Sequence, residues 1–590
     1  MKLLKTLILI LFVNFCASYE EKDDMIVEIN DGKILGRHIV SNSGKSIRAF
    51  IGIPYAEKPL GELRFKPAQK VKKWEGVLPT QDRPPLCMQF NPFIRSWLIQ
   101  GEEDCLYVNV YTPEKSDKKL PVLLYIHGGG WIRGDAYPYS PEYLLDHDII
   151  YVAANYRVGT LGYLSTEDEN CPGNYGFKDQ SFVLKWVQEN IEFFGGDKNS
   201  VTIWGESAGG ASVNYHMFSP MSKNLFHRAI SHSGTLNTCW SDPGKKGDAR
   251  KKAFFIGKQV NCIPSNENDT KELIECLRKV DAEKLIEAST KMYTWDNDPV
   301  VLFNPVIEDF ESDEEPFIAE RSFVKDSTDI PWLIGMNSEE GLLKVGAIID
   351  SKEFTDELIS GWDTILPDSF LYNYLNESEQ TEITRKINDF YFGNITVSDK
   401  MRDPKGLIDL WTDGWFIGMF ESLKNRFEQG GNDNTYVFYF THKSTASFSQ
   451  SKDFHGTCHV DDLIPLFSLR KSYYYSSVPT QHDKDLTRVM TAMWVNFART
   501  GKPNPDNLPS LPQWPAASGT SMKYLQIGNE NGNSQSLFQL KENFLTERAD
   551  FWMNLREDHK LNSWQKGNAI KKEISLILFV PLLVLLKIIS

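Results

Sequence analysis

A serine flanked by glycines is the first feature of this chain with a chemical signature. It lies in the stretch GESAGG, where Gly205 and Gly209 flank Ser207 after an apolar, β-branched segment. Such a run is typical of a tight strand-to-helix turn that exposes a nucleophilic hydroxyl at the end of a sheet. Side chains at the flanking positions would crowd the turn, which accounts for the two glycines. The pattern predicts a serine nucleophile, provided that the chain also supplies an oxyanion site, a base and an acid.

A glycine-rich loop upstream could supply the oxyanion site. The sequence HGGGW occupies residues 127–131, at the end of an apolar run. Consecutive glycines let the backbone turn its N–H groups toward a small anion, and in serine hydrolases a second donor comes from the residue after the nucleophile. Such donors stabilise charge that develops only in the transition state.

A base and an acid are available in the order that this chemistry requires, serine first, then the acid, then histidine. Glu339 and Glu340 follow an apolar run over residues 331–337, and His455 and His459 follow another over residues 435–440. Each pair stands where a strand end would project it toward the serine. Spacing alone does not choose within either pair.

The elements that must position these groups are read from short apolar runs. We expect strands over residues 121–128, 149–156, 201–204, 331–337 and 435–440, each apolar on both faces and therefore covered by helices on both sides. Residues 177–196 carry apolar side chains at helical spacing and end in two glycines. This alternation predicts a doubly wound α/β sheet, with ligand chemistry beyond the carboxyl ends of the strands.

Composition indicates one large globular domain with long surface insertions. The 590 residues are 41% hydrophobic and 24% charged, and no Pro/Gly/Ser-rich linker, charge block or repeat divides them. The formal net charge of −15 makes nucleic acid a poor candidate partner. An apolar helix around Phe551, Trp552 and Leu555 either packs internally or pairs with a partner, which leaves a homodimer open.

Both ends of the chain carry predicted targeting segments. Residues 1–18 have two lysines ahead of an apolar run and small residues at the end, which is typical of a secretory signal peptide. Residues 568–590 begin at small residues and a polar spacer before an apolar tail, the order of a glycosylphosphatidylinositol (GPI) attachment signal. The alternative is a membrane span, but its apolar stretch, residues 574–586, is shorter than the roughly 20 residues that a span needs. We therefore expect residues 19–567 to form the mature catalytic domain, on the outer face of the plasma membrane or secreted.

Seven of the eight cysteines lie beyond the predicted signal peptide, so at least one is unpaired if all bridges are intramolecular. The pairs that are near in sequence are Cys87 with Cys105 and Cys262 with Cys276, although sequence alone leaves the connectivity open. Three asparagines stand in glycosylation frames, namely Asn268, Asn376 and Asn394.

Taken together, these stretches resemble the type-B carboxylesterase and cholinesterase family of the α/β-hydrolase fold, and most closely the α-esterase type of insects and other invertebrates. The resemblance covers nearly the whole mature chain. Its matching stretches are FIGIPYAEKPLGELRFKP, EDCLYVNVYTP, HGGGW, NYGFKDQSFVLKWVQENIEFFGGD, GESAGG, GMNSEEG, GTCHVDDL and ADFWMNL.

The resemblance implies specific roles for the residues that match. Ser207 is expected as nucleophile, Glu340 as the orienting carboxylate and His459 as general base and acid, with no catalytic part for His455. The expected oxyanion donors are the N–H groups of Gly129, Gly130 and Ala208. The resemblance also implies both disulfides, an ion pair between Arg64 and Glu103, and free thiols at Cys171, Cys239 and Cys458. Glu206, next to the nucleophile, is interpreted as tuning the electrostatics of the site.

The expected activity is hydrolysis of short to medium carboxylic esters, including xenobiotics, through an acyl-enzyme that needs no metal or cofactor. Two alternatives are a choline esterase and an adhesion protein related to neuroligins; the complete triad disfavours the second. Trp97 is either a platform for a quaternary ammonium or a packed anchor of its loop. Lys344 is expected beside the active site, where its charge would repel choline. Pro299 and Val301 are expected to widen the acyl pocket, with Trp240 on another wall.

Overall fold

The computed structural model describes residues 25–266, 268–319, 329–393, 395–400, 404–431, 433–449, 451, 454, 456–469, 477–508, 511–528, 537–559 and 561. Four sequence predictions lie outside these residues. They are the signal peptide over residues 1–18, the attachment signal over residues 568–590, the glycosylation site at Asn394, and His455.

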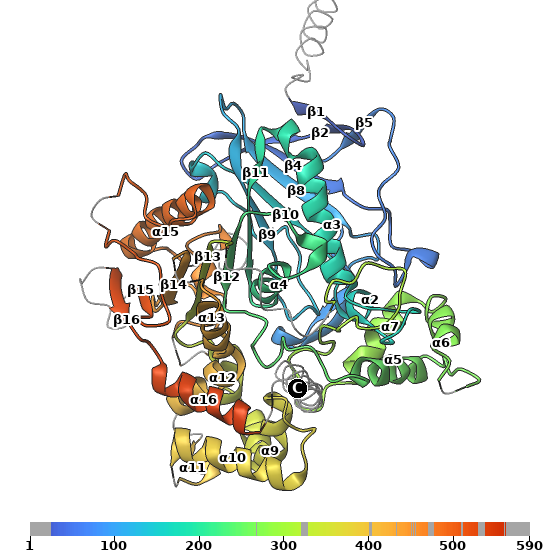
Figure 1. Cartoon of the computed structure of the whole chain (residues 1–590), viewed down its shortest axis with the longest axis vertical. Helices are drawn as coiled ribbons and strands as arrows, with labels where there is room; N and C mark the ends of the chain where they lie inside the picture. Colours follow the sequence, from blue (N-terminus) through green and yellow to red (C-terminus); the bar gives the residue numbers. More distant parts are fainter. Residues whose placement is uncertain are drawn as a thin grey trace, which may run out of the picture.

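A large twisted sheet forms the centre of the molecule (Figure 1). In the described part of the chain it has eleven strands, in the order β16 (Phe538–Glu542), β15 (Lys523–Ile527), β14 (Thr435–Phe440), β13 (Trp332–Asn337), β12 (Arg228–His232), β11 (Gly196–Glu206), β9 (Leu120–Ile126), β10 (Ile150–Ala154), β8 (Tyr107–Pro113), β4 (Ser46–Pro54) and β3 (Arg37–Val40). The strands from β15 to β10 pair in parallel, whereas β16, β8, β4 and β3 pair antiparallel at the two sides. The predicted mostly parallel α/β sheet is therefore confirmed.

Alternate residues of the central strands enter two different cores. On β9, Val122, Leu124 and Ile126 pack into one core, and Leu123 and Tyr125 pack into the other. Side chains of a strand point alternately to opposite faces, so both faces of the sheet are covered. Figure 1 shows helix α3 (Tyr175–Asn190) on one side of these strands and α15 (Gln481–Thr500) on the other. This explains why the strands are apolar throughout rather than alternating.

The five predicted strands all form. The predicted helix begins at Tyr175, continues to Asn190 as α3 and ends after a 3-10 turn at Gly195, whose φ of 85° is left-handed. One boundary differs, because β11 begins at Gly196 rather than at Val201. Polar residues separate these positions, and the pairing with β9 shifts its register between them, so no apolar run marks this half of the strand.

The remaining helices surround the sheet or extend from it. They are α2 (Gly159–Tyr163), α4 (Ala208–His216), α5 (Asp248–Gln259), α6 (Thr270–Leu277), α7 (Ala282–Thr290), α8 (Leu342–Ile349), α9 (Lys352–Ser369), α10 (Glu377–Phe392), α11 (Val397–Lys400), α12 (Pro404–Phe416), α13 (Gly418–Glu428) and α16 (Thr546–Asp558). Two smaller sheets complete the described structure, one of β1 (Ile26–Ile29), β2 (Gly32–Leu35) and β5 (Val77–Pro79), the other of β6 (Gln89–Asn91) and β7 (Ser96–Gln100).

The C-terminal helix α16 packs inside this chain. Trp552 is 3% exposed and its indole N–H donates to the Tyr391 hydroxyl at 2.7 Å. Phe551 stacks on Phe390 with ring centroids 4.1 Å apart. Arg548 binds Asp413 on α12, with Nε 2.6 Å from Oδ2. Trp552 and Phe551 of this helix therefore pack within the chain.

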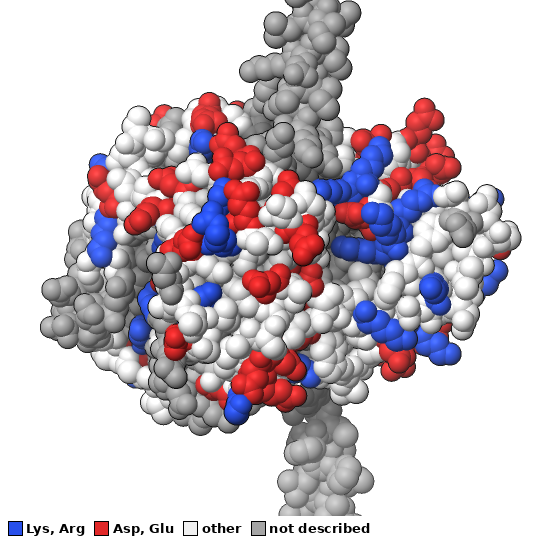
Figure 2. Space-filling view, turned by 90° about the horizontal axis from the view of Figure 1, so that it is seen from below, with Lys and Arg blue, Asp and Glu red and all other residues white. Residues whose placement is uncertain are grey.

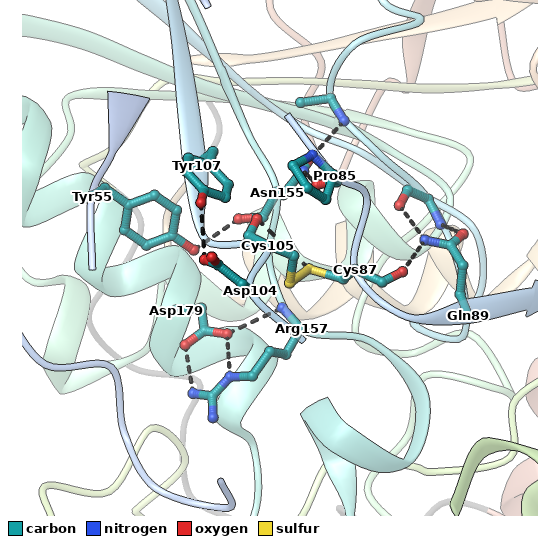
Figure 3. Close-up of a disulfide and its surroundings, with 12 residues drawn as sticks. Tyr55, Pro85, Cys87, Gln89, Asp104, Cys105, Tyr107, Asn155, Arg157 and Asp179 are labelled. Atoms are coloured by element: carbon teal, nitrogen blue, oxygen red, sulfur yellow. Dashed lines mark hydrogen bonds and ion pairs between the residues drawn. A yellow bond between two sulfur atoms is a disulfide. The ribbon is translucent and has the colours of Figure 1, made fainter. Parts of the chain in front are cut away.

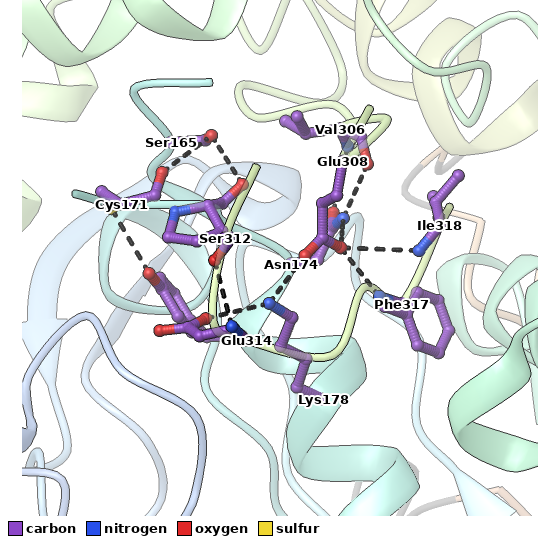
Figure 4. Close-up of polar contacts among 12 residues, drawn as sticks. Ser165, Cys171, Asn174, Lys178, Val306, Glu308, Ser312, Glu314, Phe317 and Ile318 are labelled. Atoms are coloured by element: carbon purple, nitrogen blue, oxygen red, sulfur yellow. Dashed lines mark hydrogen bonds and ion pairs between the residues drawn. The ribbon is translucent and has the colours of Figure 1, made fainter. Parts of the chain in front are cut away.

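A buried cluster of ion pairs connects helix α3 to the segment that contains Glu308 and Glu314 (Figure 4). Nζ of Lys178 lies 2.7 Å from Glu308 and 3.1 Å from Glu314, and Asn174 donates to Glu308 at 2.7 Å. Burial raises the pKa of Glu308, and Lys178 and the hydrogen bonds oppose this rise. Buried charges of this kind require such partners.

The surface carries charges of both signs. Figure 2 shows acidic and basic side chains interspersed with uncharged ones on the face that it presents. Among the described helices, none combines the length and apolarity needed to cross a bilayer.

Candidate active site

Ser207 lies on the turn between β11 and α4, as the sequence predicted for a serine between glycines. Its backbone has φ 57° and ψ −125°, a strained conformation for a residue with a side chain. A Cβ on Gly205 would lie 2.3 Å from the Gly209 carbonyl, and a Cβ on Gly209 would lie 2.1 Å from the Ile126 carbonyl oxygen. Only glycine fits at either position. The Ser207 N–H donates to the His232 carbonyl at 2.8 Å, which fixes the turn against β12.

Glu340 and His459 lie together although 119 positions separate them in the chain. Nδ1 of His459 is 2.5 Å from Oε2 of Glu340. The other oxygen of Glu340 accepts from the Asn337 N–H at 2.6 Å and from the Ser233 hydroxyl. The carboxylate is fully buried, so its orientation is fixed by these donors. This arrangement binds Nδ1 of the imidazole to the carboxylate and leaves Nε2 on the far side of the ring.

Nε2 of His459 faces a second carboxylate. It lies 3.0 Å from Oε1 of Glu206, and this buried oxygen has no hydrogen-bond partner in the described residues. Ser207 makes no hydrogen bond to His459 within the described part of the chain, but both side chains line one cavity. Phe416 packs against the imidazole, with ring centroids 4.6 Å apart.

The two carboxylates shift the protonation of the histidine. Burial lowers the pKa of His459, but Glu206 and Glu340 outweigh burial and raise this pKa to about 9. Burial also raises the pKa of Glu206 to about 8; protonated His459 opposes this, and Asp462 and Glu340 add to it. The neutral imidazole that a general base requires therefore forms at higher pH than in a free histidine.

The glycine loop has the backbone that an oxyanion site needs. Gly129 has φ 108° and Gly130 has φ 64°, both left-handed. Ala208 is the first residue of α4, where N–H groups have no partner within the helix. In the described residues the N–H groups of Gly129, Gly130 and Ala208 bind no protein acceptor. A Cβ on the neighbouring Gly128 would lie 3.0 Å from Cβ of Ser207, so the loop adjoins the serine.

The cavity that contains these groups has a volume of about 350 Å³ and a largely apolar wall. Its lining residues are Asn91, Phe93, Ile94, Gly129, Gly130, Arg133, Tyr139, Glu206, Ser207, Trp240, Val300, Val301, Leu343, Trp415, Phe416, Ser447, Phe448, Ser449, His459, Val460 and Leu469. Trp240 and Val301 lie in this wall as expected, whereas Pro299 does not line it.

The expectation for Lys344 is wrong, and of the two interpretations of Trp97 the structure supports the packed loop residue. Lys344 does not present its charge to the cavity, because its fully buried Nζ lies 3.0 Å from both Asp296 and Asp298. The neighbouring Leu343 lines the wall instead. Trp97 is 44% exposed, packs on Phe90 and Tyr293, and is absent from the cavity wall. It therefore offers no platform for a quaternary ammonium at this site.

The disulfide Cys87–Cys105 closes the loop that carries β6 and β7 (Figure 3). A second disulfide joins Cys262 to Cys276, and among the cysteines that the structure describes Cys171, Cys239 and Cys458 form no disulfide. Arg64 binds Glu103 through two hydrogen bonds of 2.6 and 2.5 Å. Figure 3 also shows Arg157 bound to Asp179 beneath the disulfide.

The other sequence predictions concern the surface and metal binding. Asn268 and Asn376 are exposed, and Asn376 caps α10 by accepting from the Glu379 N–H at 3.0 Å. In the described ranges no group of His, Cys, Asp or Glu is arranged to hold a metal ion.

Sequence reasoning missed three contributors to the site. Ser233 and Asn337 orient Glu340, and Arg133 lines the cavity. Arg133 stands two positions after the glycine loop in the sequence, so its position was a usable signal. Ser233 carries no such signal, because only the packing of β12 beside β13 brings it to Glu340.

The fold and the site together define a hydrolase of the α/β-hydrolase class. Residues 23–552 match the model of the carboxylesterase family. The juvenile hormone esterase of Tribolium castaneum is 31% identical, covering 94% of this chain and 98% of that protein. Venom carboxylesterase-6 of Apis mellifera is 32% identical, covering 95% and 100%, and esterase E4 of Myzus persicae is 33% identical, covering 85% and 90%. The chain belongs to the carboxylesterase family and is a carboxylic ester hydrolase.

Proposed function

We propose that Ser207, Glu340 and His459 form the catalytic triad of this hydrolase. The observation that carries this proposal is the Glu340–His459 contact of 2.5 Å, in a cavity that the strained Ser207 turn also lines. A carboxylate on Nδ1 leaves Nε2 as the base for the serine. Ser207 and His459 line one cavity, and bound substrate commonly tightens the contact between a catalytic base and its partner.

The reaction then proceeds in two halves. His459 takes the proton of Ser207 as its oxygen attacks the ester carbonyl, and the N–H groups of Gly129, Gly130 and Ala208 hold the resulting oxyanion. Protonated His459 gives its proton to the departing alcohol, which leaves an acyl group on Ser207. Water attacks this acyl-enzyme by the same route, and the carboxylic acid leaves with the serine regenerated.

Short to medium carboxylic esters, including xenobiotic ones, are the substrates that we propose for this cavity. Its volume and its wall of Trp240, Val300, Val301 and Phe416 suit a compact apolar acyl group. A choline ester requires an aromatic platform near the serine. Trp97, the platform that the sequence suggested, is exposed and lies outside the cavity wall, so it does not supply this platform.

Replacing Ser207 tests the nucleophile directly. We expect Ser207→Ala to abolish hydrolysis of 1-naphthyl acetate while leaving the melting temperature within a few degrees of the parent. In the parent protein an organophosphate should leave a phosphoryl adduct on the Ser207 peptide, detectable by mass spectrometry. Full activity in the variant, or an adduct on another serine, would overturn the assignment.

Comparing substrates tests the specificity. We expect a higher kcat/KM for 1-naphthyl acetate than for acetylthiocholine. A strong preference for acetylthiocholine would reverse the choice of substrate class. The same two assays on Ser207→Ala serve as the control for contaminating activity, because both activities must disappear in that variant.

We further propose that residues 19–567 are the mature domain, secreted after removal of residues 1–18 and anchored through a GPI lipid that replaces residues 568–590. The two disulfides support an oxidising compartment. Phosphatidylinositol-specific phospholipase C should release the protein from intact cells, and retention would favour a membrane span. Glycosidase treatment should lower the mass if Asn268, Asn376 or Asn394 carries a glycan.

A further inference from the structure

Arg133 stands in the active-site wall without a partner for its charge. It is partly buried, its Nε is fully buried with no hydrogen-bond partner, and no carboxylate lies within ion-pair range among the described residues. The guanidiniums of Arg157 and Arg95, by contrast, bind Asp179 and Asp296. A partly desolvated cation without a counter-ion costs free energy, which an anionic ligand would recover.

The surroundings offer Arg133 no substitute anion. The carboxylate of Glu206 lines the same cavity but makes no ion pair with Arg133. Asp135 is already bound by Arg83, with Nη2 2.5 Å from Oδ2. Even Oδ1 of Asn91, an acceptor in the same wall, is buried without a partner.

The backbone of Arg133 is fixed against the glycine loop. Its N–H donates to the Gly129 carbonyl at 3.2 Å. The next residue, Gly134, is clamped by Gln89, which accepts from its N–H at 2.7 Å and donates to its carbonyl at 2.9 Å. Figure 3 shows Gln89 extending from the disulfide loop to make these bonds. The backbone that carries Arg133 is thus held next to the loop of the proposed oxyanion donors.

Arg133 also lines a second cavity next to the active site. A second cavity, of about 450 Å³, shares Asn91, Ile94, Arg133 and Tyr139 with the active site. Its wall is more polar and includes Gln89, Ser96 and Gln100. An ester whose reacting carbonyl lies at Ser207 could therefore extend past the guanidinium into a polar space.

We propose that Arg133 binds a carboxylate carried by the ester substrate at a distance from the bond that is cleaved. The substrate class is then the anionic carboxylic esters, such as half-esters of dicarboxylic acids. Guanidinium binds carboxylate through two parallel hydrogen bonds, which also orients the substrate. This inference rests on the proposed function, because it places the reacting carbonyl at Ser207.

The test compares matched esters with and without the carboxylate. One pair is monoethyl adipate and ethyl hexanoate, where the charge lies on the acyl side. The other is the butyryl ester of 4-hydroxybutyric acid and butyl butyrate, where it lies on the alcohol side. Each pair is assayed with the parent, Arg133→Met and Arg133→Lys, and with Arg385→Met as control. Arg385 pairs with Asp389 on the exposed face of α10, so this control removes one charge far from the site.

We expect Arg133→Met to lower kcat/KM for at least one anionic ester by about 10- to 100-fold, the effect of a charged hydrogen bond, and for its neutral partner by no more than about 3-fold. The pair of esters that responds tells whether the carboxylate bound by Arg133 lies on the acyl side or on the alcohol side of the substrate. Arg133→Lys should restore part of the difference, added salt should weaken binding of the anionic ester alone, and Arg385→Met should change neither ester. Equal losses on charged and neutral esters would overturn the inference and leave Arg133 a structural residue.

The activity of Ser207→Ala separates this inference from the proposed function. If neutral esters are turned over and Ser207→Ala abolishes this turnover, the proposed function stands whatever the Arg133 variants show. If Ser207→Ala retains activity, the proposed function itself fails.

Discussion

Oε1 of Glu206 lies 3.0 Å from Nε2 of His459, on the side of the ring opposite to Glu340. The histidine is therefore held between two carboxylates, and both favour its protonated form. This explains why the residue before the nucleophile affects the base. It also means that Glu206 competes with the serine for the same ring nitrogen.

Replacing Glu206 should move the pH profile of the reaction. The pKa of His459 is raised, and the base works when neutral, so activity is expected to rise with pH through that pKa. Glu206→Gln removes one of the two carboxylates and should shift the acid limb of kcat/KM down by about 1 to 2 pH units. The readout is kcat/KM for p-nitrophenyl acetate across pH. Glu189→Gln, which removes an exposed carboxylate paired with Lys70, is the control. An acid limb that stays in place in Glu206→Gln would contradict this electrostatic role.

Removing the Ser233 hydroxyl should slow the chemical step. Ser233 donates to Glu340, which in turn orients His459. Loss of one such hydrogen bond is worth about 1 kcal/mol, so Ser233→Ala should lower kcat about 5- to 10-fold with KM little changed. Ser231→Ala is a matched control, because that buried hydroxyl donates to Gly210 and accepts from Trp332 without touching Glu340. If both variants lose kcat equally, Ser233 has no special positioning role.

Removing the buried Lys344 charge should destabilise the fold. Its Nζ lies between Asp296 and Asp298, and Arg95 remains bound only to the first of these. Lys344→Met leaves Asp298 buried without its cation and should cost about 3 to 5 kcal/mol of unfolding free energy, measured by urea denaturation. Lys352→Met, in an exposed pair with Asp356, should change stability little. A stable Lys344→Met protein with improved acetylthiocholine turnover would mean that the lysine charge acts at the active site after all.

The two disulfides should differ in their effect on catalysis. They close loops of 18 and 14 positions, so removing either should lower stability by about 3 kcal/mol on the chain-entropy estimate. Replacing Cys87 and Cys105 by serine should also lower kcat/KM, because their loop brings Asn91, Phe93 and Ile94 to the cavity. Replacing Cys262 and Cys276 should leave kcat/KM at permissive temperature unchanged. Denaturation curves and steady-state kinetics of both double variants, measured together, decide the matter; equal kinetic losses would speak against a link between the first loop and the site.

Local signals made much of the fold predictable. Runs apolar on both faces predicted β9, β10, β13 and β14, because a strand covered on both sides has no polar face to interrupt the run. The same logic failed for the first half of β11, where polar residues and a register shift conceal the strand.

The sequence by itself determined which catalytic groups the chain contains and in which order they occur. The glycines around Ser207 and in the 127–131 loop have local steric causes, and the order of serine, acid and histidine is a property of the chain. Resemblance, not spacing, selected Glu340 over Glu339 and His459 over His455. In the structure, Glu339 instead accepts a hydrogen bond from the Thr457 N–H at 2.7 Å.

Only the tertiary structure decided which charges are neutralised. Lys344 and Arg133 look alike as isolated cations near the predicted site, yet Lys344 is enclosed by two aspartates and Arg133 by none of those described. The aspartates that pair with Lys344 lie in a different segment of the chain, whereas no described carboxylate pairs with Arg133. A charge is stabilised or left open by groups within a few ångströms, and that distance is set by packing rather than by position along the chain.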